Sequence, residues 1–250
     1  MRGFWAVWKR ELLAQLVTPL AWVLFVVFLL VEGLHFDLLV EHFSAHPELV
    51  SAETPLQAFF GNSVFFYLVL FLFAPALTMR LFAEERRNGT LEPLLTAPVS
   101  PAAIVLGKYA AVLSTYVAMW APTLLYVLIV ARAGPIDWST VASAYAGVAL
   151  VGAGYLAVGL LMSALTSSQI VALVLTSLVV LGLFMLGVFG EYIAREGTRL
   201  HDVAVYVSVW AQMNDFAAGI VDTRHLVFSG SMIAVPLFLA VRRLEAERWA

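Results

Sequence analysis

The stretch from Phe82 to Pro98 reads FAEERRNGTLEPLLTAP and lies between two long apolar runs. Charged side chains are rare at membrane depth, so a run of Glu-Glu-Arg-Arg should stand in water. The same stretch carries three leucines, which a purely connecting loop does not need. We therefore expect an amphipathic segment that docks onto something soluble; its apolar residues are Leu91, Leu94 and Leu95.

The composition of the rest of the chain is that of a membrane protein. Of the 250 residues, 62% are hydrophobic and 12% are charged, against roughly 25% charged in a soluble domain. The net charge of -3 and the lack of a basic cluster away from the membrane ends disfavour a nucleic-acid partner. The chain has no cysteine, which excludes disulfides, thiolate metal sites and cysteine nucleophiles. No small-x-small cleavage site follows Lys9 and Arg10, so a signal peptide is not expected.

The hydropathy pattern predicts an all-α polytopic protein with six transmembrane helices in one domain, residues 1–250. A span needs about 20 mostly apolar residues. The predicted spans are Pro19–Leu30 with an amphipathic continuation to Val40, Ser63–Met79, Ile104–Val130, Val141–Leu165, Ile170–Phe189 and Leu226–Val241.

The distribution of Lys and Arg predicts the orientation. Ten of these residues fall in the two terminal segments and the loop between spans two and three, and four fall in the other loops. The positive-inside rule then places both termini in the cytoplasm. We accordingly expect a multi-pass protein of the cell (inner) membrane.

Three segments are predicted not to span. Residues 1–17 place Trp5, Trp8, Leu12 and Leu16 on one helical face, which favours a helix in the cytoplasmic interface; a cytoplasmic extension of span one is the alternative. Residues 80–101 form the charged loop. Residues 191–225 show helical spacing and should form one or two external amphipathic helices resting on the membrane face.

Four parts of the sequence resemble the type-2 ABC exporter permeases, most closely the gliding-motility-associated permease group. The most specific is the stretch EERRNGTLEPLLTAPVS followed by IVLGK. The others are WKREL ahead of TPLA, the run SALTSSQIV, and FAAGIVD leading into RRLE. Pro93 departs from the family pattern, where an ordinary helix former is expected, and is predicted to shift the start or the angle of the docking helix.

The resemblance implies a permease subunit that works as a pair with a second permease subunit, identical or similar, and with separate cytoplasmic ABC ATPase subunits. The chain itself has no Gly-x4-Gly-Lys-Ser/Thr loop, so ATP should be bound and hydrolysed by the partner and no cofactor is expected here. The implied ATPase-coupling residues are Glu84, Glu85, Arg86, Arg87, Gly89, Thr90, Leu91, Glu92, Leu94 and Leu95. Gly89 should end a first helix, and the charged residues should fix the position of the segment on its partner. Glu247 is expected to lie outside this motif.

Several alternatives stay open at this level. The run Thr166, Ser167, Ser168 and Gln169 is either a plain turn or a second coupling loop. The histidines, all expected in external segments, could in principle ligate a metal with neighbouring carboxylates, although such loops are usually only hydrated. A non-transporting scaffold is a second function. An intramembrane enzyme is disfavoured because no histidine or carboxylate is expected in the membrane core. A periplasmic partner and membrane lipid are further expected contacts, and the substrate is not readable.

Overall fold

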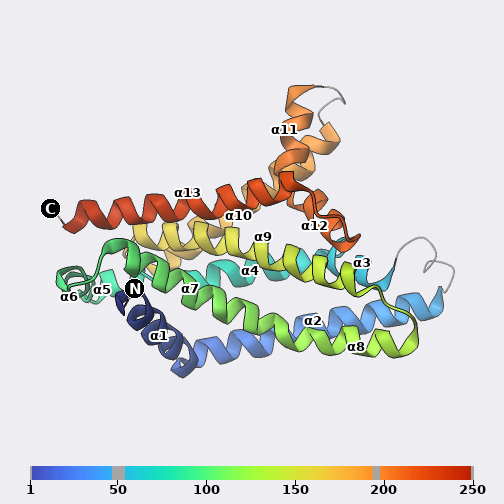
Figure 1. Ribbon diagram of the computed structural model, residues 1–250, viewed down its shortest axis with the longest axis horizontal. Coiled ribbons are helices and arrows are strands. Elements are labelled where there is room, and N and C mark those ends of the chain that lie inside the picture. The colour runs from blue at the N-terminus through green and yellow to red at the C-terminus, as the bar shows by residue number, and fades with distance from the viewer. Residues whose placement is uncertain (1, 47–53, 194–197, 249–250) are drawn as a thin grey trace.

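The computed structural model describes residues 2–46, 54–193 and 198–248, and every element within these ranges is a helix, as the sequence predicts (Figure 1). The α-helices are α1 Arg2–Val17, α2 Pro19–Ala45, α3 Pro55–Phe60, α4 Val64–Thr78, α5 Ala83–Arg87, α6 Leu91–Thr96, α7 Pro101–Trp120, α8 Leu124–Ala133, α9 Trp138–Leu165, α10 Gln169–Ile193, α11 Arg199–Val207, α12 Val209–Ala217 and α13 Thr223–Arg248. A 3-10 turn, η2 Ala121–Thr123, joins α7 to α8.

Six helical units in the described ranges are long and apolar enough to cross a membrane, as predicted. They are Pro19–Ala45, Pro55–Arg87, Pro101–Ala133, Trp138–Leu165, Gln169–Phe189 and Thr223–Arg248. The first is longer than its strictly apolar core suggested. The helix continues through Glu32 and Asp37 to Ala45 because no proline interrupts it.

The centre of the bundle is α9, which packs against α13, α4, α10, α12 and α7. Its glycines permit this packing. A Cβ at Gly147 would meet the Phe216 ring at 2.7 Å, and Cβ atoms at Gly152 and Gly159 would overlap Tyr116 and Thr78. Small residues at these positions let neighbouring helices approach closely, which is the usual arrangement in membrane bundles.

Both ends of the described chain lie at one end of the bundle, together with α5 and α6 (Figure 1), as an even number of crossings requires. We call this the α5–α6 end. The helix α1 is separate from α2, because Thr18 precedes a proline and is extended (φ -78°, ψ 128°). It packs along α7, where Trp8 Nε1 donates a 3.2 Å hydrogen bond to Ser114 Oγ.

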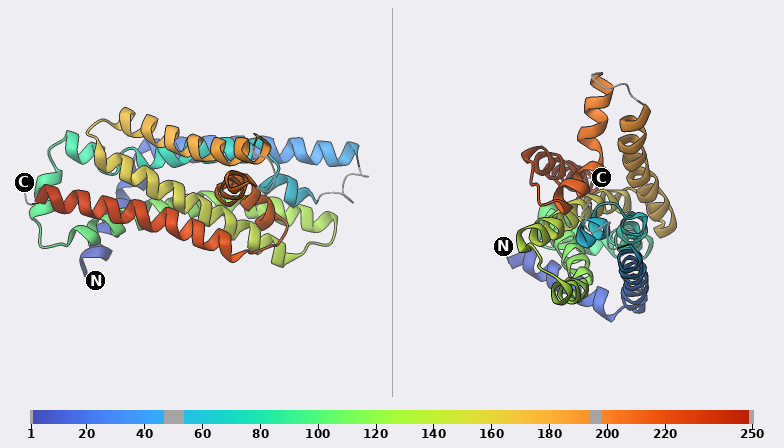
Figure 2. Two further views of the ribbon diagram at one scale, coloured as in Figure 1. Left: turned by 90° about the horizontal axis from the view of Figure 1, so that it is seen from above. Right: turned by 90° about the vertical axis from the view of Figure 1, so that its right-hand side faces the viewer.

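At the other end, α10 and α11 rise away from the bundle axis, and α12 lies across α9 and α3 (Figure 2). Two helices therefore occur in the predicted 191–225 region, although its residues 194–197 lie outside the described ranges.

Two expectations about ionisable residues are wrong. His35 is not external: it lies within α2 and is 2% exposed, beside Glu32, which is 0% exposed. The core of the spans therefore contains both a histidine and a carboxylate. The burial of Glu32 and His35 could not be predicted from the sequence, because periodicity alone does not show which face of a lipid-exposed helix is covered by other helices.

Candidate functional site

The 80–101 segment folds into two short helices joined by a sharp turn. Helix α5 ends in a glycine motif: Thr90 N–H donates to Glu85 O (2.9 Å) and Gly89 N–H to Arg86 O (3.3 Å). Gly89 adopts φ 69°, a conformation that favours glycine. The predicted role of Gly89 as a helix end is confirmed. Pro93 is the third residue of α6, where a missing N–H leaves no intrahelical bond unmade.

The start of the segment is fixed by Ser163 near the end of α9. Its Oγ accepts hydrogen bonds from Phe82 N–H (3.0 Å) and Ala83 N–H (3.1 Å) and donates to Met79 O (3.1 Å). Phe82 and Ala83 are fully buried. The polypeptide therefore leaves α4 and enters α5 along one defined path held by the central helix.

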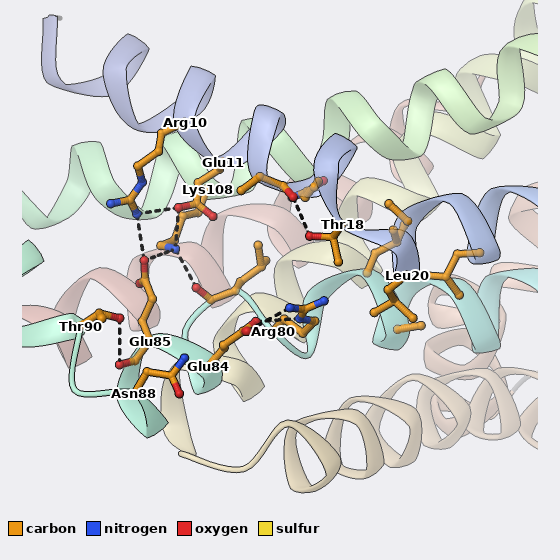
Figure 3. A pocket seen from close by; sticks show the side chains of 17 residues that line it. Arg10, Glu11, Thr18, Leu20, Arg80, Glu84, Glu85, Asn88, Thr90 and Lys108 are labelled. Carbon is orange, nitrogen blue, oxygen red and sulfur yellow. Dashed lines mark hydrogen bonds and ion pairs between the residues drawn. The ribbon is translucent and has the colours of Figure 1, made fainter.

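Lys108 on α7 is the central residue of a network of ion pairs at the α5–α6 end (Figure 3). It is 1% exposed, and its Nζ donates to Leu81 O at 2.7 Å. It forms ion pairs with Glu85 on α5 (3.0 Å) and Glu11 on α1 (3.1 Å). Arg10 bridges the same two carboxylates, at 2.9 Å from Glu85 and 2.6 Å from Glu11. This network connects α1, α5 and α7.

Two further ion pairs hold α5. Arg86 Nη2 contacts both carboxylate oxygens of Glu247 on α13, at 2.7 and 2.9 Å, and Arg243 also reaches Glu247 at 2.9 Å. Arg80 forms a bidentate pair with Glu84 at 2.7 and 2.9 Å. The hydrogen bonds from Arg80 lower the pKa of the Glu84 carboxyl. Glu247 lies outside the motif in the sequence, as expected, but its side chain contacts the motif, because it pairs with Arg86 across 161 residues.

The three leucines differ in exposure. Leu91 and Leu95 are 6% and 7% exposed and pack into the core of this chain, whereas Leu94 is only partly buried. Leu91 and Leu95 therefore anchor α6 and are not free to contact another protein, contrary to the expectation from the sequence. The exposed part of the motif is Arg87, Asn88, Gly89, Thr90, Glu92 and Pro93. We call these six residues the exposed rim.

A cavity of about 390 Å³ lies behind the rim (Figure 3). One wall is charged and comes from α1, α5 and α7, including Arg10, Glu85 and Lys108. The other wall comes from α2 and the end of α4 and contains the apolar side chains Leu20 and Leu77. The site is thus amphipathic and lies where two spans meet the helices that lead away from them.

The 166–169 turn lies at the same end of the bundle, three residues after Ser163. Thr166 Oγ1 accepts from Ser168 N–H (3.1 Å), Ser168 Oγ accepts from Val171 N–H (3.4 Å), and Gln169 begins α10. The side chain of Ser168 thus caps α10, and that of Thr166 closes the turn before it, as in a plain turn. Ser167 is exposed.

Sequence reasoning missed the residues that fix the segment in place: Arg10, Glu11, Lys108, Ser163 and Glu247. The one available signal was Lys108, a lone cation at the start of an apolar run, because a buried cation needs a partner. Nothing local in the sequence pointed to Ser163 or Glu247. Among the described residues, no group of three His, Asp or Glu side chains could hold a metal ion.

A family model described as ABC-2 family transporter protein matches residues 42–236. The chain belongs to the ABC-2 family. The match spans more than three quarters of the chain and includes the 80–101 segment and the 166–169 turn. No curated protein matches the chain significantly.

Membership of the ABC-2 family establishes several coarse properties. The chain is a multi-pass membrane protein and a permease component of an ABC transporter. An ABC-2 permease is the transport component and is not an enzyme by itself, and it normally pairs with a cytoplasmic ATPase.

Proposed function

We propose that this chain is the membrane subunit of an ABC exporter and that its 80–101 segment transmits the movement of a separate ATPase into the bundle. The observation that carries the proposal is the network around Lys108. It connects α5 to α1 and α7, while Arg86 connects α5 to α13. A force on α5 is thereby delivered to three helices distant in the sequence. ATP is bound and hydrolysed by the partner in this account.

The contact surface we assign to the ATPase is the exposed rim together with Leu94. The buried leucines Leu91 and Leu95 hold α6 against the bundle from within. Of the charges in the motif, Arg87 and Glu92 are exposed, and hydrogen bonds to charged groups are the stronger ones. They are the residues best placed to set the register of a partner. The 166–169 turn at the same end would add a smaller second contact through Ser167.

The proposed orientation puts the α5–α6 end in the cytoplasm and the chain in the cell inner membrane, with both termini cytoplasmic. It is supported by the basic residues that the bundle gathers at this end, which include Arg10, Arg80, Arg86 and Arg243. Helix α1 is then the interfacial helix at headgroup level, with the exposed Trp5 toward lipid.

A second permease subunit, identical or similar, would complete the transporter. Helices α2 and α10 expose long apolar faces, with Leu30 67% and Leu178 61% exposed, and these faces would meet the second subunit or lipid. Helices α11 and α12 at the far end would face a periplasmic partner. The resemblance of the 84–95 motif further supports placement near the gliding-motility-associated group. In a mechanical variant of the account, the bundle pulls on that external partner without carrying a substrate.

The experiment that tests the proposal replaces Leu94 by Asp. Burying an uncompensated polar group costs about 2–7 kcal/mol, so an Asp at this partly buried contact position should weaken binding of the ATPase. We expect loss of ATPase co-purification and of transport-stimulated ATP hydrolysis, with membrane insertion unchanged. The matched control is Val203→Asp, which adds the same charge to an exposed aliphatic residue on α11. A Leu94→Asp protein that retained its ATPase at the wild-type ratio and full coupled activity would refute the assignment.

A further inference from the structure

A buried ionisable pair lies in the first span, at a distance from the α5–α6 end. Glu32 is 13 residues from Pro19, the first residue of α2, which places it about 20 Å along the helix at 1.5 Å per residue. A hydrocarbon core is about 30 Å thick. Glu32 and His35 therefore lie inside the bilayer, toward the end opposite α5 and α6. Ionisable groups at this depth are costly and usually functional.

The imidazole of His35 lies beside a carboxylate and between two aromatic rings. His35 Nδ1 is 3.3 Å from Glu32 Oε2. The imidazole ring stacks on Phe59 of α3 (centroids 4.6 Å apart, 8° between planes) and on Phe65 of α4 (5.4 Å, 21°). The bundle thus encloses the imidazole between two aromatic rings.

Glu32 and His35 can each form a further hydrogen bond. Glu32 Oε1 and His35 Nε2 are buried and have no hydrogen-bond partner among the described residues. Three phenols lie near enough to interact electrostatically with the carboxylate: Tyr116 of α7, Tyr126 of α8 and Tyr145 of α9. Helices α3 and α4 contribute the two phenyl rings. An unpaired carboxylate in such surroundings would be strongly penalised, and His35 is the polar partner that the fold places beside Glu32.

A path leads to the pair from the end opposite α5 and α6. A cavity of about 520 Å³ is lined by His35 and by His42, which lies two helical turns further along the same face of α2. Asn62 and Ser63 line the same cavity, and His42 itself is exposed. The imidazole of His35 is thus within reach of polar side chains that can relay a proton from water.

We propose that Glu32 and His35 form an intramembrane proton-binding site that is loaded through the cavity lined by His42, Asn62 and Ser63. Uptake of a proton by Glu32 removes the carboxylate that pairs with His35, which weakens the packing of α2 on α3 and α4. The site is independent of the ATPase contact proposed above.

The first test is infrared difference spectroscopy of the full-length protein in lipid nanodiscs, with Glu32→Gln as the subtraction reference. We expect no protonated-carboxyl band from Glu32 at pH 7 in the wild type and its appearance on acidification. In His35→Phe the band should already be present at pH 7, because the carboxyl has lost the imidazole partner that pairs with it. His35→Gln, which retains a polar side chain, should give the same result if His35→Phe does not fold.

The control is Glu41→Gln, which removes an exposed carboxyl on the same helix. Its own difference band should titrate identically with and without His35. A Glu32 band in the wild type at pH 7, or no band at pH 7 in a folded His35 variant, would overturn the proposal.

The path is tested separately with Asn62→Cys, because the chain has no native cysteine. Labelling the thiol of this variant with a bulky reagent should slow the appearance of the Glu32 band after a pH jump. Ser44→Cys, on the exposed end of α2 and outside this cavity, is the matched control and should have no effect when labelled. An unchanged rate in labelled Asn62→Cys would rule out this route.

Discussion

Arg86 on α5 and Glu247 on α13 are 161 residues apart in the chain, and their side chains meet at 2.7 Å. The contact joins the charged segment between spans two and three to the helix that ends the chain. Both side chains are about one-fifth exposed, so water screens the pair only in part. An ion pair thus joins the C-terminal end of α13 to the segment that carries the proposed ATPase contact.

Replacing Glu247 by Ala should weaken this connection without unfolding the protein. A partly exposed ion pair contributes up to about 1 kcal/mol, so the thermal unfolding temperature should change little. We expect the ATPase to remain bound while transport-stimulated hydrolysis falls several-fold. Glu245→Ala, which breaks the exposed pair with Arg242 on the same helix, is the control. An equal loss of transport-stimulated hydrolysis in both variants would show that the contact with Arg86 has no specific role in coupling.

Replacing Lys108 by Met should be much more damaging. Lys108 is buried, and its removal leaves Glu85 and Glu11 close together with only Arg10 to neutralise them. Breaking a buried pair by removing one partner costs about 3–5 kcal/mol. Chemical denaturation of the purified protein should show this loss. Lys9→Met, which removes an exposed cation on α1, should leave stability unchanged.

The pair of Arg80 and Glu84 predicts a pH dependence. Because the folded pKa of Glu84 is lowered, its stabilising contribution is present above the unfolded pKa of about 4.3. This contribution is lost as the pH falls through the lower pKa that Glu84 has in the folded state. Wild type and Glu84→Gln should therefore differ in unfolding free energy at pH 7, by less than about 1 kcal/mol because the pair is one-third exposed. The difference should shrink as the pH falls below the unfolded pKa; a constant difference would contradict this cause.

The orientation can be tested by single cysteines, since the chain has none of its own. Ser44, Asn88, Asp137 and Thr198 are all exposed, so labelling by an impermeant reagent depends only on the side of the membrane. We expect Asn88→Cys to be protected in sealed right-side-out vesicles and the other three to be labelled. Labelling of Asn88→Cys from outside would reverse the proposed topology.

The number and type of the spans could be predicted from the sequence because length and apolarity alone decide whether a helix can cross a bilayer. The turn at Gly89 could be predicted because a helix end followed by glycine is a local signal. The burial of Leu91 and Leu95 within their own chain could not be predicted. Amphipathic spacing shows that a helix has an apolar face, but not whether its own chain or another protein covers that face.

The long-range contacts could not be predicted from the sequence either. Ser163 meets Phe82, and Glu247 meets Arg86, only because α9 and α13 end at the same level of the bundle as α5. That level is set by the packing of α9 against its neighbours, not by any local pattern. Glu32 and His35 were missed for the same reason: α3, α4 and α8 cover that face of α2.

The contact between the exposed rim and the ATPase is the central claim, and site-specific photocross-linking in the intact complex tests it most directly. A photoreactive amino acid at Glu92, which is exposed, should give an adduct with the co-purified ATPase. The same group at Val203 on α11 should give none. An intact complex that yields no ATPase adduct from position 92, or that yields one from position 203, would contradict the account.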